Sequence, residues 1–208
     1  ANDAISLSQT AEGALGKTGD MLQRMRELAV QSANATNGSA DRDNLQAEYL
    51  QLGEEITRTV SSTRFNGQAI LTTAGTLSFQ VGANSGDQVD VDTSDLSAGD
   101  IAAAVTETID GADNTASLSA MDAIDLALTE VNTARADYGA AQNRFEAVIA
   151  NLMISAENQS AARARIMDAD FAAETANLSR AQILQQAGNA MVAQANQLPQ
   201  QVLSLLQR

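Results

Sequence analysis

Clusters of acidic residues are the parts of this sequence that could bind a cation or take part in a reaction. Asp90, Asp92 and Asp95 offer carboxylate oxygens, which hard cations such as calcium prefer. Their spacing does not match an EF-hand loop, which also requires a central glycine and a terminal glutamate. The spacing therefore favours a solvated acidic edge over a cation site.

Two carboxylate pairs could in principle support acid–base chemistry, namely Glu54 with Glu55 and Asp168 with Asp170. Both pairs fall in helical patterns that give no sign of a cleft. The loop 82–86 contains two glycines, but no Gly-Lys-Ser/Thr follows it, so it is not a phosphate loop. The chain has no His and no Cys, and so lacks the commonest general base, the commonest metal ligand and any thiolate. We predict that it is not an enzyme and needs no cofactor or metal.

The composition excludes further classes of function. With 12 basic and 26 acidic residues among 208, the formal net charge is −14, which argues against a nucleic-acid partner. No apolar run approaches the roughly 20 residues that a membrane-spanning helix needs, so we expect no membrane insertion. Hydrophobic residues make up 44% of the chain but aromatic residues only 3%, which predicts thin, close-packed seams between helices.

A polar cluster at 23–28 contains two arginines, Arg24 and Arg26. Arg24 and Leu28 are four residues apart and therefore share one helix face. One interpretation is an exposed face with an Arg26–Glu27 neighbourhood of little energetic value. The other is an interface anchor, because arginine beside an apolar residue is typical of interaction surfaces.

The elements that must position these residues follow from hydrophobic periodicity. Steps of three and four predict helices over about 1–34, 41–63, 118–158 and 163–206. Alternating residues around a glycine-containing loop predict a β-hairpin over about 76–92. We therefore expect a mostly α fold: an elongated antiparallel helical bundle or coiled coil with a small β-hairpin region.

The two later helices have apolar stripes with particular features. On the helix at 118–158 the expected seam includes Ile124, Val131 and Phe145, and Arg135 and Gln142 occupy two places in it. On the helix at 163–206, Pro199 predicts either a kink or a stop near residue 197. This last helix has one clear apolar face, which predicts a partner in a preceding N-terminal segment or another subunit.

Long ordered runs at both ends of the chain resemble bacterial flagellins. They cover nearly the whole length and include the segments 2–7, 10–15, 22–32, 142–145, 161–166, 179–188 and 194–206. The resemblance implies a structural subunit that self-assembles into the flagellar filament for motility. It also implies a core domain over 1–160, the C-terminal half of an inner terminal domain over 163–208, a truncated N-terminal helix and no outer domains.

The resemblance implies partners and a location as well. Flagellins are secreted through the flagellar type III export apparatus, bind a dedicated export chaperone and a filament cap, and form an extracellular filament. Chaperone and assembly contacts are expected at the apolar positions Ile183, Leu184, Met191, Leu198, Val202 and Leu205. Many flagellins are recognised by Toll-like receptor 5, an innate immune receptor. The corresponding receptor and intersubunit positions are Gln23, Arg24, Leu28, Gln31, Leu45, Glu48 and Arg144.

Two other functions remain open at this point. A hook–filament junction protein shares the same end architecture, although the C-terminal runs favour a filament protein. A surface-displayed module could instead bind a glycan or a host protein through the acidic end of the chain.

Overall fold

The computed structural model describes residues 1–206, with side chains described through residue 196. It confirms the mostly helical fold with a small β component. The chain divides into two compact units, 1–153 and 154–208. The first unit contains nearly all of the buried residues. Its helical part is built from α1 (Asn2–Ser32), α2 (Ser39–Ser62), the short α3 (Asp100–Thr106) and most of α4 (Thr115–Met167).

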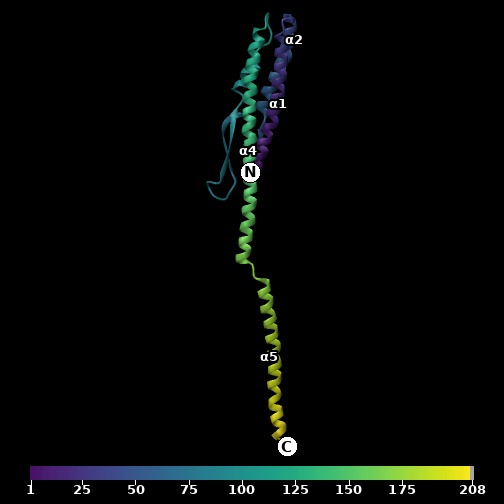
Figure 1. Cartoon of the computed structure of the whole chain (residues 1–208), viewed down its shortest axis with the longest axis vertical. Helices are drawn as coiled ribbons and strands as arrows, with labels where there is room; N and C mark the ends of the chain where they lie inside the picture. Colours follow the sequence, from purple (N-terminus) through teal and green to yellow (C-terminus); the bar gives the residue numbers. More distant parts are fainter. Residues whose placement is uncertain (207–208) are drawn as a thin grey trace. The chain divides into compact units, whose positions relative to one another are not determined.

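Helices α1 and α2 form an antiparallel pair, and α4 runs antiparallel along α1 (Figure 1). The direction of α4 follows from its contacts. Arg26 near the end of α1 pairs with Asp125 near the start of α4, and Glu12 lies beside Arg135 further along. The chain turns from α1 to α2 at Gly38, whose N–H donates to the Asp41 carboxylate and so begins α2.

The helices bury heptad-like stripes. On α1 the buried positions advance by three and four along the whole helix, and the buried hydroxyls of Ser8 and Thr18 donate to carbonyls one turn earlier. On α4 the buried positions are Ser117, Ala120, Ile124, Ala127, Val131, Ala134, Tyr138, Ala141 and Phe145.

The α4 stripe corrects the sequence prediction in one respect. Arg135 and Gln142 do not occupy places in the seam; the neighbouring alanines Ala134 and Ala141 do. Arg135 and Gln142 lie at the flank, where both reach Glu12 on α1. The seam alternates large residues with alanine because small side chains allow the helix backbones to approach closely. The buried stripe does not extend to Leu152, which is 41% exposed.

The β component is larger than predicted. A short hairpin pairs β1 (Arg64–Phe65) with β2 (Gln68–Ala69), and the expected hairpin pairs β3 (Thr72–Gln80) with β4 (Gln88–Asp95). The main hairpin lies along α4, where the Phe79 and Phe145 rings meet edge to face at 5.7 Å (Figure 1). The β1–β2 turn has positive φ at Asn66 and Gly67, two residue types that readily adopt it.

The second unit contains the end of α4 and α5 (Phe171–Leu206), separated by residues 168–170. The predicted boundary between the third and fourth helices lay at 158–163, so α4 is longer than expected. α5 continues across Pro199, without the stop near residue 197 that was one of the two alternatives.

Candidate interaction surface

Arg24 is the centre of an exposed charged cluster that joins α1 to α2. Its Nε donates to Glu48 Oε1 at 2.9 Å, and its Nη1 donates to Glu27 Oε2 at 2.9 Å. The side chains of Arg24 and Glu48 are 49% and 46% exposed. These hydrogen bonds, which Arg24 donates to the carboxylates of Glu48 and then Glu27, raise the pKa of the Arg24 guanidinium. The structure thus brings together two of the positions that the sequence assigned to an interface.

The pairing leaves these charges available to a partner. An exposed ion pair contributes about 0–1 kcal/mol to stability, so Arg24 and Glu48 can exchange one partner for another at little cost. Gln23 and Gln31 are also exposed on α1. The exposed side chains of Gln23, Arg24, Gln31 and Glu48 are called the α1–α2 surface below.

Leu28 and Leu45 have different positions from those expected. Leu28 is 1% exposed and belongs to the core, so it supports the α1–α2 surface from below and does not form part of it. Leu45 is partly buried against the same core. The four-residue spacing predicted that Leu28 would share a helix face with Arg24. Leu28 instead points into the bundle.

Arg144 lies apart from this cluster. Its Nη1 donates to the backbone carbonyl of Asp90 on β4 at 3.5 Å, so it faces the hairpin. Within residues 1–206 no hydrogen bond or ion pair joins Arg144 to Arg24 or Glu48. A partner that touched all three would have to span the bundle from α2 to the hairpin.

A groove of about 570 Å³ between α1 and α4 was not anticipated. It is lined in part by Gln23, Val30 and Leu128, and Arg26 spans it to Asp125 with an Nε–Oδ1 distance of 2.7 Å. Arg26 is exposed, as one of the two interpretations expected, but it pairs with Asp125, 99 positions away, and not with Glu27. The antiparallel alignment of the two stripes is the signal that would have found this pair.

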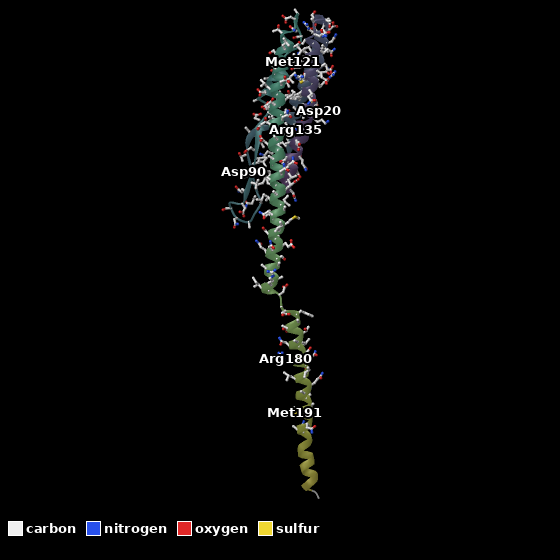
Figure 2. The ribbon with its side chains drawn as sticks, viewed as in Figure 1. Asp20, Asp90, Met121, Arg135, Arg180 and Met191 are labelled. Atoms are coloured by element: carbon white, nitrogen blue, oxygen red, sulfur yellow. The ribbon has the colours of Figure 1, made fainter. Side chains whose placement is uncertain are left out.

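Helix α5 presents large apolar side chains to solvent. Ile183 and Leu184 are each 65% exposed, and Met191 is 72% exposed. Figure 2 labels Met191 on α5. Exposed apolar side chains at helical spacing are typical of surfaces that bind a partner. The remaining predicted positions, Leu198, Val202 and Leu205, lie outside the residues with described side chains.

The acidic residues of the hairpin already have structural partners. Thr76 and Ser78 on β3 donate to Asp92 and Asp90 across the strands at 2.8 and 2.6 Å. Asp95 accepts hydrogen bonds from Ser97, and these lower its pKa. No group of carboxylates in the described part of the chain could hold a metal ion. None of the described helices is long and apolar enough to cross a membrane.

Comparison with known proteins matches both ends of the chain to one family. Residues 1–76 match the bacterial flagellin N-terminal helical region, and residues 121–206 match the bacterial flagellin C-terminal helical region. A flagellin of Halalkalibacterium halodurans is 50% identical over 207 residues, covering 98% of this chain and 75% of the relative. A flagellin of Bacillus subtilis is 41% identical over 236 residues, covering 98% of this chain and 78% of the relative.

A solved structure supports the same assignment. The crystal structure of Bacillus cereus flagellin superposes with a TM-score of 0.65 at 34% sequence identity, covering 77% of this chain and 92% of that chain. Sequence and fold therefore support the same family assignment. The chain belongs to the bacterial flagellin family, whose members are structural proteins of the extracellular flagellar filament and not enzymes.

Proposed function

We propose that this chain is a self-assembling structural subunit of a bacterial flagellar filament and that α5 supplies an assembly seam. The observation that carries the proposal is the exposure of Ile183, Leu184 and Met191 on one described helix. Each buried side chain of this size contributes about 1.5–3 kcal/mol, so covering this face gives a substantial driving force for assembly. We place the core domain at about 1–160 and the inner terminal segment at 163–208, close to the division between the two compact units.

Seeded elongation tests this role. Filament fragments are mixed with the chain, and growth is followed by light scattering and electron microscopy. Ile183→Asp should slow elongation at least tenfold, because a charge would have to be buried in the seam. Gln185→Asp adds the same charge on the same helix at a polar position and should elongate normally. Equal growth of both variants would contradict an α5 seam.

We also propose that the α1–α2 surface and Arg144 contact neighbouring subunits and, in the monomer, Toll-like receptor 5. The support is the resemblance together with the exposed, exchangeable Arg24–Glu48 pair. Arg24→Ala and Glu48→Ala should each weaken receptor signalling by purified monomer. Arg58→Ala is a matched control, because Arg58 also forms an exposed ion pair, with Glu55. Unchanged signalling by the Arg24 and Glu48 variants would remove the receptor assignment.

Export is the remaining part of the proposal. We infer that the chain leaves the cell by the flagellar type III route, with a chaperone covering Ile183, Leu184, Met191, Leu198, Val202 and Leu205 and a filament cap guiding assembly. The exposed apolar side chains of α5 support the chaperone contact. Leu184→Asp should weaken binding of the cognate chaperone in titration calorimetry, whereas Gln186→Asp should not. Equal affinities would contradict a chaperone site on this face.

A further inference from the structure

The turn between β1 and β2 contains an exposed Asn-Gly pair. Asn66 has φ 50° and Gly67 has φ 81°, the positive values that a two-residue type I′ hairpin turn requires. Within the described chain, neither the Asn66 amide nor the Gly67 nitrogen takes part in a hydrogen bond beyond the strand pairing. No heavy atom beyond the neighbouring residues lies within 4 Å of the position that a Gly67 side chain would occupy.

A second Asn-Gly pair, Asn37-Gly38, has the opposite environment. The Gly38 nitrogen donates to Asp41 Oδ2 at 3.1 Å at the start of α2, and the Asn37 amide donates to the Gln31 carbonyl. Both groups that a cyclisation at this pair needs are therefore held in hydrogen bonds. The same dipeptide thus occurs once with its reacting groups engaged and once with them available.

We propose that Asn66 is a site of spontaneous deamidation, with water as the co-reactant, and that Asn37 is protected. The Gly67 nitrogen attacks Cγ of Asn66, a bond forms between them, and the Cγ–Nδ2 bond breaks. The side-chain nitrogen leaves as ammonia, taking the proton of the Gly67 nitrogen. Water then opens the five-membered succinimide: cleavage at Cγ gives aspartate, and cleavage at the backbone carbonyl gives isoaspartate. No oxidant or reductant is needed.

The turn can reach the geometry for ring closure because its hairpin is short. β1 and β2 each have two residues, and a hairpin of this size is marginally stable, so its tip opens locally. Ile70 and Leu71 directly after β2 are fully buried, and they anchor the segment while the tip opens. Aspartate adds one negative charge beside the turn. Isoaspartate lengthens the backbone and disrupts the pairing of Phe65 with Gln68.

The test is peptide mapping by mass spectrometry of the intact chain during incubation in mildly alkaline buffer. Deamidation at Asn66 should be about tenfold or more faster than at Asn37, because one or two hydrogen bonds must first break at Asn37. In denaturant the two sites should react at similar rates. Asn66→Gln, which would need a six-membered ring, should abolish the reaction at that position.

Asp41→Ala is the decisive variant. It removes the acceptor of the Gly38 nitrogen and should raise the rate at Asn37 severalfold while leaving Asn66 unchanged. Circular dichroism checks that α2 remains folded. The proposal is overturned if native Asn37 reacts as fast as Asn66, or if Asn66 stays intact in the native chain while reacting in the denatured one. An unchanged Asn37 rate in folded Asp41→Ala would contradict protection by the capping bond.

Discussion

Arg42 should be among the most important polar residues for stability. Its side chain is 3% exposed at the end of the bundle where α1 meets α2. Nε donates to the Ser32 carbonyl at 3.0 Å, and Nη1 donates to the Gly111 carbonyl at 3.2 Å. The guanidinium thus ties the end of α1 to the segment that leads into α4. Arg42→Met keeps the apolar stem but leaves both carbonyls without this donor.

The magnitude follows from these two bonds. Hydrogen bonds to a charged group contribute about 1.5–3 kcal/mol each, and the recovered hydration of the guanidinium offsets part of the sum. We expect Arg42→Met to lower the free energy of unfolding by about 3 kcal/mol, and Tm by about 6–12 °C. The free energy of unfolding of Arg42→Lys should lie between those of Arg42→Met and the parent protein, because a single ammonium group does not reproduce the several N–H donors of the guanidinium.

The assay should report on the first unit alone. The chain has two tyrosines and no tryptophan, and Tyr49 and Tyr138 are both buried in that unit. Tyrosine fluorescence during urea unfolding therefore follows the bundle and is insensitive to α5. Arg58→Met is the matched control, since exposed Arg58 should contribute less than about 1 kcal/mol. If Arg42→Met cost no more than Arg58→Met, the reasoning from the two buried bonds would be refuted.

Three further predictions concern the bundle. Tyr138→Phe should cost about 1 kcal/mol at neutral pH, measured by urea unfolding, because the Tyr138 hydroxyl donates to the Ile70 carbonyl at 3.0 Å; an unchanged midpoint would count against it. Burial raises the pKa of Tyr138 from 10.0 to about 12, so its neutral form favours folding below pH 10, and this contribution is lost as the pH rises through about 12. Between pH 10 and about 12, the free energy of unfolding should therefore fall less steeply with pH in Tyr138→Phe than in the parent protein. Equal slopes in the two proteins would contradict a contribution from Tyr138. Ala134→Leu should cost about 1–3 kcal/mol by overpacking the α1–α4 seam, and Arg135→Leu should cost less than about 1 kcal/mol. If thermal unfolding showed a larger loss of stability for Arg135→Leu than for Ala134→Leu, it would support the original prediction that Arg135 lies in the seam.

The sequence predicted the helices and the main hairpin well because periodicity reports which face of an element is apolar. It assigned two places in the α4 stripe to Arg135 and Gln142, since each has an alanine directly before it and only packing against α1 selects Ala134 and Ala141. The buried positions of Arg42 and Gln46 on α2 were also missed. Their partners are the carbonyl oxygens of Ser32 and Gly111 and the N–H of Ile109, which no local pattern in the sequence reveals.

The candidate surface was predictable only in part. Glu48 as the partner of Arg24 lies on a different helix, and the resemblance rather than the spacing brought the two together. Arg26 and Asp125 are far apart in the sequence, and their pairing depends on the antiparallel alignment of α1 with α4. Leu28 was assigned to the interface because it lies four residues after Arg24, but a four-residue step rotates a helix by slightly more than one turn, which carries the side chain into the core.

Oxidation of Met191 during assembly reports directly on whether α5 is an assembly seam. Met191 is 72% exposed on the single chain, whereas Met25 in the core is fully buried and serves as the internal reference. Monomers and seeded filaments are treated briefly with peroxide, and the oxidation of each methionine is measured by mass spectrometry. If α5 is an assembly seam, Met191 reacts readily in the monomer and is protected in the filament. Equal reactivity of Met191 in monomer and filament would contradict the assembly role assigned to this helix.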